Sequence, residues 1–294
     1  MRSPVSTPIF RDDLDDVEEY VLSGDVWLRT ASHGEGPPLL LCHGGPGACD
    51  NLAPVASMIA DLVRTHRYDQ RGCGRSGHVA SNRLADSVAD IERLREHWGY
   101  ERWKLCGHSW GASLALLYAL AHPERVERLI LLATTGILPI GPEYRAGWRS
   151  RLAPEDLDHI DRLRSRMEHA DEQTLYALRQ EVMMMKFRTD LADPDTALQL
   201  PEYDCPVNFG VNAALGSQWG ELIGGEEIRS RVAAIGAPVL ILAGAADPRT
   251  DLGARDLAGL LPDARLVMLP GVGHYPWLEH PELLRAELRS ALSA

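Results

Sequence analysis

Short apolar runs alternate with helix-forming segments over the first 135 residues. Strands are predicted at residues 39–42, 62–68, 103–106 and 126–133, and the first of these is a continuous apolar run typical of a strand buried on both faces. The segments between them, at 52–60, 85–98 and 112–121, carry helical periodicity or strong helix formers. Because strands joined by helices pair in parallel, the pattern predicts a mostly parallel sheet with helices on both faces.

Strand patterns also lie at the two ends of this arrangement. Residues 17–22 and 26–31 flank the turn sequence Ser23-Gly24-Asp25, which predicts an opening β-hairpin. Toward the other end of the chain, strands are predicted at 237–243 and 264–269, with a helix at 251–261 between them and a closing helix from Pro281.

The pattern changes between residue 136 and about residue 230, where no strand is predicted. Helical periodicity covers 155–170, 171–187 and 217–231, with proline and glycine between these segments. We interpret residues 136–235 as an inserted helical lid over the carboxyl-end edge of the sheet. Residues 1–135 and 236–294 then form the core.

Composition limits the possible partners. The 294 residues are 45% apolar and 24% charged, with a net charge of −12, which disfavours nucleic acid and anionic membranes. No apolar run is long enough to span a bilayer, and residues 1–10 contain no signal-peptide segment. The five cysteines form an odd set without C-x-x-C spacing, which argues against a disulfide framework. We therefore expect a cytoplasmic protein.

The pentapeptide Gly107-His108-Ser109-Trp110-Gly111 lies between a predicted strand and a predicted helix. G-x-S-x-G occurs by chance in glycine-rich chains, but in this context it is typical of a nucleophile elbow, a sharp turn that exposes the serine hydroxyl. The glycines let the strand and helix backbones approach closely. We expect Ser109 to be the nucleophile and His108 to be structural or to line the substrate pocket.

Two further side chains follow later strands. His274 lies on a glycine-bounded loop after 264–269, and Asp247 follows 237–243. The ordinary pKa of histidine suits it to remove the Ser109 proton, and an aspartate would orient the imidazole. Each residue alone is also common in surface loops and turns, but the order Ser, Asp, His at three strand ends predicts a catalytic triad. Asp251 is the alternative acid.

Acyl transfer also requires donors for the oxyanion of the tetrahedral intermediate. One is expected to be the amide of Trp110, and the other an amide of the loop His43-Gly44-Gly45-Pro46-Gly47. The alternative is a plain Gly/Pro turn after a strand. No metal or cofactor is expected, because the eleven histidines show no H-E-x-x-H spacing and no G-x-x-x-x-G-K-[ST] loop occurs.

Three motifs together carry a family resemblance. They are His43-Gly44-Gly45-Pro46-Gly47, Asp69-Gln70-Arg71-Gly72-Cys73-Gly74-Arg75-Ser76 and Ser109-Trp110-Gly111. The chain resembles the proline iminopeptidase group of α/β-hydrolases over most of residues 35–135 and 235–294. The resemblance implies an α/β-hydrolase fold with a helical lid, oxyanion donors at the amides of Gly45 and Trp110, and release of N-terminal proline through an acyl-serine intermediate without metal or cofactor. Substrate contacts are expected from His43, Gly44, His108 and Met184.

The departures from this group concern the substrate. His108 replaces the usual glycine of the elbow, and Pro248 follows Asp247 where some members have an acid. These peptidases hold the free amino end of the substrate with lid glutamates, but residues 207–213 contain no acid. Possible substitutes, which are ordinarily solvated residue types, are Glu181, Glu202, Asp204 and Glu221. A pocket without a buried carboxylate favours a neutral or apolar acyl group, as do the adaptable side chains of Met183-Met184-Met185.

The sequence therefore predicts a serine hydrolase that uses an acyl-enzyme and acts on a small molecule or short peptide. Proline iminopeptidase-like activity is the leading hypothesis. The second is an ester, lactone or amide hydrolase for a small metabolite. The third, from another class, is a ligand-binding protein of the same fold with little turnover. The oligomeric state is not predicted.

Overall fold

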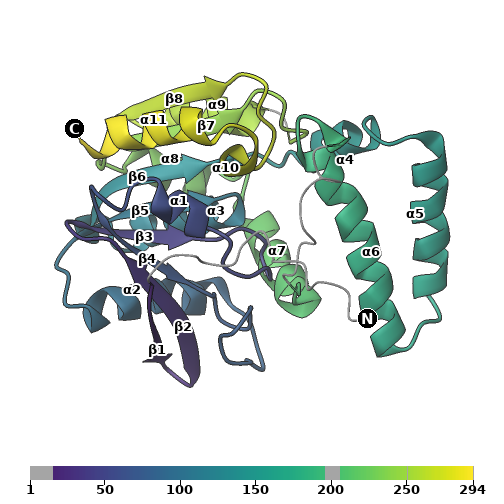
Figure 1. Cartoon of the computed structure of the whole chain (residues 1–294), viewed down its shortest axis with the longest axis horizontal. Coiled ribbons are helices and arrows are strands. Elements are labelled where there is room, and N and C mark those ends of the chain that lie inside the picture. The colour runs from purple at the N-terminus through teal and green to yellow at the C-terminus, as the bar shows by residue number, and fades with distance from the viewer. Residues whose placement is uncertain (1–15, 196–205, 250, 294) are drawn as a thin grey trace, which may run out of the picture.

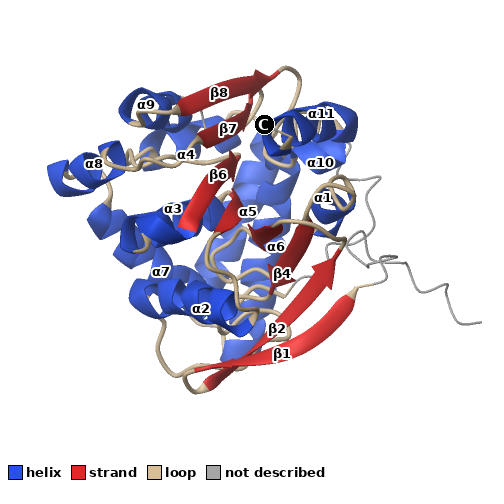
Figure 2. Ribbon diagram, turned by 90° about the vertical axis from the view of Figure 1, so that its left-hand side faces the viewer, coloured by secondary structure: helices blue, strands red, loops and turns tan. Residues whose placement is uncertain are grey.

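The computed structural model describes residues 16–195, 206–249 and 251–293. Eight strands of the described chain form one sheet in the order β1-β2-β4-β3-β5-β6-β7-β8 (Figures 1 and 2). They are β1 (Val17–Ser23), β2 (Val26–His33), β3 (Pro38–Cys42), β4 (Arg64–Tyr68), β5 (Trp103–His108), β6 (Val126–Leu132), β7 (Val239–Gly244) and β8 (Ala264–Leu269). The β1–β2 and β2–β4 pairs are antiparallel and the others parallel. The predicted fold class is confirmed.

Helices cover both faces of the sheet (Figure 2). One face packs against α1 (Ala53–Ser57), α10 (Pro276–Glu279) and α11 (Pro281–Leu292). The other packs against α2 (Leu84–His97), α3 (Trp110–Ala121), α8 (Glu226–Ala233) and α9 (Leu252–Leu260). In β3, Leu39 and Leu41 pack on the first of these faces, whereas Leu40 and Cys42 pack on the other. All four side chains are fully buried. Burial on both faces explains why this strand is a continuous apolar run.

Between β6 and β7 the described residues form helices and loops and no strand, in agreement with the predicted pattern. They form α4 (Gly141–Arg149), α5 (Pro154–Met167), α6 (Glu172–Asp190), α7 (Phe209–Leu222) and α8. Figure 1 shows α5 and α6 as a pair that projects away from the sheet, with α7 between this pair and the sheet. The division into core and lid stays a prediction. Helix α8 belongs to the predicted lid by sequence but packs on the sheet through Ile228 and Val232.

Two details of the insertion differ from the predicted helices. The single helix expected over 217–231 is two helices, because Gly224 adopts φ = 82° and ends α7 before α8 begins. Helix α4 was not predicted, since its sequence contains Gly141, Pro142 and Gly147. Pro142 occupies the first turn, where a missing N–H costs nothing.

The cysteines correct one prediction. Cys42, Cys73 and Cys106 are free and buried, but Cys49 is disulfide-bonded. Cys205, the fifth cysteine, lies outside the described residues. The spacing of cysteines along the chain does not report which distant thiols the fold brings together, so the sequence argument against a disulfide was wrong for Cys49. Among the helices of the described chain, none combines the length and apolar character needed to cross a membrane.

Candidate active site

Ser109 lies on the predicted sharp turn between β5 and α3. Its backbone has φ = 54° and ψ = −116°, an unusual conformation for a residue with a side chain. A Cβ atom on Gly107 would lie 2.1 Å from the carbonyl oxygen of Gly111, and one on Gly111 would lie 2.0 Å from that of Cys42. Both glycines are therefore required for the close approach of strand and helix that exposes Ser109.

His274 and Asp247 are in direct contact. His274 Nδ1 lies 2.5 Å from Asp247 Oδ2, and both side chains are buried. Burial alone would raise the pKa of Asp247, but His274 and Arg249 outweigh it and hold that pKa well below the ordinary value. Asp247 is therefore ionised and His274 Nδ1 is the protonated nitrogen, which leaves Nε2 available to accept a proton. Asp251, the alternative acid, instead pairs with Arg255 at 2.5 Å.

Arg249 is a site residue that the sequence argument missed. Its backbone N–H donates to Asp247 Oδ1 at 2.9 Å, and its guanidinium donates to Asp190 through two bonds of 2.8 and 2.9 Å. A further bond of 3.3 Å joins Nη1 to Asp247 Oδ1. The guanidinium also lies 4.5 Å from the Tyr144 ring centroid. Arg249 thus fixes the Asp247 oxygen that His274 does not use.

The loop that carries His274 is held from two sides. The His274 amide donates to the Asp190 carbonyl at the end of α6 at 2.7 Å. The Glu279 carboxylate accepts the amides of Gly273 at 2.9 Å and Ala192 at 2.6 Å. The contacts to Asp190 and Ala192 join residues that are far apart in the chain, so no local sequence pattern indicates these roles of Asp190 and Glu279.

The predicted oxyanion donors lie on the same cavity as Ser109 and His274. The cavity is lined by Gly45 and Trp110 together with those two residues. Among the hydrogen bonds of the described residues, neither the Gly45 amide nor the Trp110 amide donates to a protein group. Gly45 has φ = 131°, and a Cβ atom there would lie 2.8 Å from the Gly47 nitrogen. The loop therefore depends on glycine at this position.

His43 does not contact the cavity, in contrast to its predicted role in substrate binding. It is fully buried, its Nδ1 donates to the Gly44 carbonyl at 2.8 Å, and its Nε2 accepts the Gln70 amide at 3.0 Å. The Gln70 side chain donates to the His43 carbonyl at 2.8 Å and accepts the Trp110 indole N–H at 2.9 Å. This network connects residues 43–47, the predicted oxyanion loop, to Trp110, the first residue of α3. His43 and Gln70 therefore hold these two segments together.

His108 lines the cavity and is buried. Its Nε2 donates to the His274 carbonyl at 2.9 Å, and the two ring centroids are 4.8 Å apart. Burial lowers the pKa of His108, and the nearby His274 lowers it further, so the ring is neutral near pH 7. In the described part of the chain no hydrogen bond joins Ser109 to His274, and such catalytic bonds are often long in unliganded enzymes.

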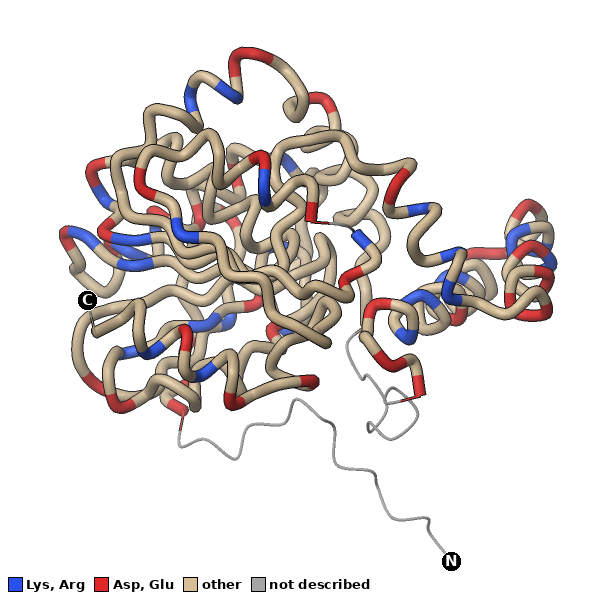
Figure 3. The backbone as a smooth tube through the Cα atoms, turned by 90° about the horizontal axis from the view of Figure 1, so that it is seen from above, with Lys and Arg blue, Asp and Glu red and all other residues tan. Residues whose placement is uncertain are grey.

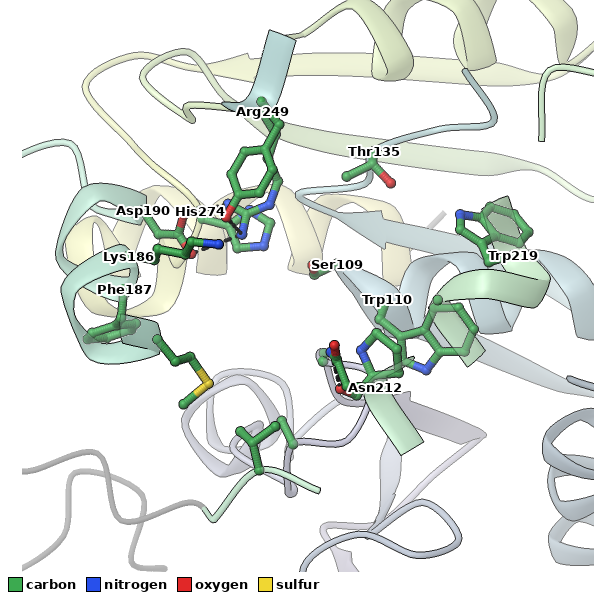
Figure 4. A pocket seen from close by; sticks show the side chains of 18 of the residues that line it. Ser109, Trp110, Thr135, Lys186, Phe187, Asp190, Asn212, Trp219, Arg249 and His274 are labelled. Atoms are coloured by element: carbon green, nitrogen blue, oxygen red, sulfur yellow. Dashed lines mark hydrogen bonds and ion pairs between the residues drawn. The ribbon is translucent and has the colours of Figure 1, made fainter. Parts of the chain in front are cut away.

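The cavity has a volume of about 910 Å³ and extends from Ser109 to helices α4, α5, α6 and α7 (Figure 4). Gly44 and Met184 line it as predicted, as does Met183. Glu181 and Glu221 do not line it, and Glu181 instead pairs with His159 at 2.7 Å on the exposed surface. The other predicted substitutes, Glu202 and Asp204, lie outside the described residues. No group of three His, Cys, Asp or Glu side chains in the described chain is arranged as a metal site.

Curated relatives match part of this chain. The proline iminopeptidase of Neisseria gonorrhoeae is 38% identical over 135 residues, which cover 44% of this chain and 44% of that protein. The probable proline iminopeptidase of Streptomyces coelicolor is 36% identical over 155 residues, or 45% of this chain and 47% of that protein. The matched stretch is thus less than half the length of each relative. The resemblance to proline iminopeptidases is confirmed.

Solved structures extend the similarity to nearly the whole chain. The crystal structure of the Mycobacterium smegmatis proline iminopeptidase superposes with a TM-score of 0.67 at 21% identity and covers 94% of this chain and 98% of that one. At this identity the superposition shows a shared fold. The family model described as alpha/beta hydrolase fold matches residues 37–281. The chain therefore belongs to the α/β-hydrolase fold family.

Proposed function

We propose that the chain is a serine hydrolase that acts through a Ser109-His274-Asp247 triad and an acyl-enzyme. One observation carries the proposal: Ser109, His274, Gly45 and Trp110 line a single cavity, and the amides of Gly45 and Trp110 donate no hydrogen bond within the described chain. These are the nucleophile, base and oxyanion donors that acyl transfer requires.

In the first half of the reaction Ser109 Oγ attacks the substrate carbonyl while His274 Nε2 takes its proton. The Asp247 carboxylate stabilises the imidazolium through the 2.5 Å contact with Nδ1. The amides of Gly45 and Trp110 donate to the oxyanion, and His274 then protonates the leaving group as the carbonyl–heteroatom bond breaks. In the second half, His274 removes a proton from a water molecule that attacks the acyl carbon. The bond between this carbon and Ser109 Oγ then breaks, His274 returns the proton to Oγ, and the acid is released.

Proline iminopeptidase-like activity on a small amide is the leading specific assignment, and the named relatives support it. A different observation favours a second candidate, an ester, lactone or amide hydrolase for a small metabolite. Among the described residues that line the cavity, Asp190 is the one carboxylate, and Arg249 already engages both of its oxygens. This part of the cavity therefore offers no free carboxylate for a substrate ammonium.

Substrate choice is tested by hydrolysis of proline p-nitroanilide and of p-nitrophenyl butyrate, with Ser109→Ala as the blank. Serine-dependent cleavage of the anilide supports the iminopeptidase assignment, and cleavage of the ester alone supports the second candidate. A saturable ligand bound without turnover of either compound would favour the third hypothesis, a binding protein.

The substrate is proposed to be a small molecule or short peptide rather than nucleic acid or membrane. The cytoplasmic location expected from the sequence also remains a proposal. The disulfide at Cys49 removes the argument from the cysteines for this location, because disulfides are rare in reducing compartments. Fractionation of cells that express the tagged protein would test the location directly.

A further inference from the structure

The cavity has the opposite charge balance to the chain as a whole. The chain carries a net charge of −12, and Figure 3 shows acidic and basic residues interspersed along the backbone. Among the described residues that line the cavity, however, one is a carboxylate, Asp190, and four are cations: Arg164, Arg179, Lys186 and Arg249. An anionic group would be favoured in this cavity over a cationic one.

Lys186 is the one of these four cations that is partly withdrawn from solvent and has no ion pair with a carboxylate of the described residues, because Arg164 and Arg179 are exposed. Arg249 is paired with Asp190, Arg164 with Asp161 at 3.2 Å, and Arg179 lies over the Phe209 ring at 5.7 Å. The half-buried Lys186 ammonium lies 4.9 Å from the Trp148 ring centroid, and no carboxylate of the described residues forms an ion pair with it.

The surroundings of Lys186 make its charge costly in the free protein. Burial lowers the pKa of Lys186, and Arg164 and Arg249 lower it further, whereas Asp190 opposes them. A bound anion would offset both the desolvation and the repulsion between these cations. A charge-assisted hydrogen bond to Lys186 would therefore contribute more than the same bond at an exposed surface.

The position of Lys186 relative to Ser109 indicates which part of a substrate it would meet. Figure 4 shows Lys186, Asp190 and Arg249 together with His274 on one side of Ser109, and Trp110, Asn212 and Trp219 on the other. The contact between the His274 amide and the Asp190 carbonyl places the end of α6 on the histidine side. A leaving group departs on that side, because His274 supplies its proton.

The opposite wall is formed by α7 and borders the oxyanion loop. Asn208 donates its amide to the Gly47 carbonyl at 2.8 Å, and the Asn212 side chain donates to the Pro46 carbonyl at 2.8 Å. The lining side chains there are mostly apolar: Val207, Phe209, Trp219 and Ile223. This wall suits an uncharged acyl group.

We propose that the cavity takes acyl compounds whose leaving group carries a carboxylate, and that Lys186 binds this carboxylate. The matching chemical class is short peptides with a free carboxyl end and acyl-amino acids. The inference rests on the proposed serine hydrolase function. The acyl carbon–heteroatom bond is broken and the Ser109 Oγ–carbon bond is formed, His274 delivers the proton to the leaving group, and the carboxylate takes no part in the bond changes.

A matched pair of esters tests the inference. The butyryl esters of para-hydroxybenzoate and para-hydroxybenzamide share shape and acyl group but differ in the charge of the leaving group. After correction for their spontaneous hydrolysis, we expect kcat/KM to be roughly 10-fold to 100-fold higher for the carboxylate. Lys186→Met should bring this ratio close to one, and Lys186→Arg should retain part of it. Arg166→Met, which removes an exposed positive charge from α5 outside the cavity, should leave the ratio unchanged.

Each outcome separates the inference from the proposed function. Serine-dependent hydrolysis with equal kcat/KM for the two esters would overturn the inference and leave the proposed function standing. A preference that survives in Lys186→Met would overturn the assignment to Lys186. If neither ester is cleaved, the proposed function is unsupported for this acyl group, and calorimetric titration of Ser109→Ala with each ester decides the inference. The inference is supported if the carboxylate ester binds more tightly than the amide ester and Lys186→Met abolishes this difference. Equal binding of the two esters, or no binding, overturns it.

Discussion

Asp247 is held by two different donors, and its two oxygens therefore have separate roles. Oδ2 faces His274 Nδ1, while Oδ1 accepts the amide and guanidinium of Arg249. Arg249 in turn is fixed by Asp190 on α6. The orientation of His274, the proposed base, thus depends on contacts that run from Asp190 on α6 through Arg249 to Asp247 after β7.

The first prediction concerns the acid. Asp247→Asn should lower kcat by roughly 10,000-fold, because an asparagine stabilises the wrong imidazole tautomer and cannot stabilise the imidazolium. Asp251→Asn is the matched control, since Asp251 lies four residues away and pairs with Arg255 rather than His274. Steady-state hydrolysis of p-nitrophenyl butyrate by both folded variants measures the effect. Near-normal kcat for Asp247→Asn would show that another residue is the acid.

The second prediction concerns Gln70, which joins the oxyanion loop to Trp110. Gln70→Met should lower kcat by roughly 10-fold to 100-fold with a small change in KM, because the two oxyanion donors lose their common support. Trp110→Phe removes only the indole donor to Gln70 and should cost less. Equal changes in kcat and KM for Gln70→Met would indicate a role in substrate binding instead of positioning.

At the scale of the elements, the junction of β5 and α3 leaves no room for a methyl group. We predict that Gly111→Ala lowers the free energy of unfolding by about 1–3 kcal/mol or more, because the new Cβ would lie 2.0 Å from the Cys42 carbonyl oxygen. Gly216→Ala is the control: it lies within α7 with no atom within 4 Å of the added Cβ. It should raise the free energy of unfolding by about 0.5–1 kcal/mol. Urea denaturation measures both, and a neutral effect of Gly111→Ala would contradict the described elbow.

Element positions were predictable where a local pattern determined them. The apolar run at 39–42 and the helix formers at 112–121 predict β3 and α3 because both are buried and regular. The break between α7 and α8 was missed, since a Gly-Gly pair within an amphipathic pattern does not by itself show whether a helix bends or ends.

The candidate site was predictable in part for the same reason. Strand ends and motif spacing predicted that Ser109, Asp247 and His274 follow strands, and they lie after β5, β7 and β8, whereas their catalytic roles stay a proposal. Asp190, which pairs with Arg249 and accepts the His274 amide, belongs to a distant segment, the end of α6. Only tertiary packing brings α6 to these residues, and one sequence contains no record of that packing.

At the scale of the whole molecule, two carboxylates make the free energy of unfolding depend on pH in the acidic range. The pKa of Glu92 is lowered to about 2, chiefly by Arg95, against the opposing effect of burial and with help from Tyr118. Glu92 accepts the Tyr118 hydroxyl at 2.6 Å and thereby joins α2 to α3. The pKa of Asp247 is also lowered, because His274 and Arg249 outweigh the burial that would raise it.

A carboxylate with a lowered folded-state pKa stabilises the protein above its unfolded pKa, and this contribution is lost as pH falls toward the folded value. We therefore predict that the free energy of unfolding falls as pH is lowered from about 5 to about 2. Glu92→Gln should be less stable than the wild type at pH 7, and the difference should shrink as the pH falls. Urea denaturation at several pH values measures this, and a constant difference would contradict the described Glu92 contacts.

The central claim is that Ser109 is a nucleophile activated within the described cavity. Labelling by a fluorophosphonate probe tests it most directly, because the probe forms a covalent bond only with an activated serine. Ser113→Ala is the matched control, since Ser113 lines the same cavity one turn further along α3. We predict stoichiometric labelling of the wild type and of Ser113→Ala, with the adduct on Ser109 by peptide mass spectrometry, and no labelling of Ser109→Ala. Labelling that persists in Ser109→Ala, or a wild type that the probe does not label, would contradict the account.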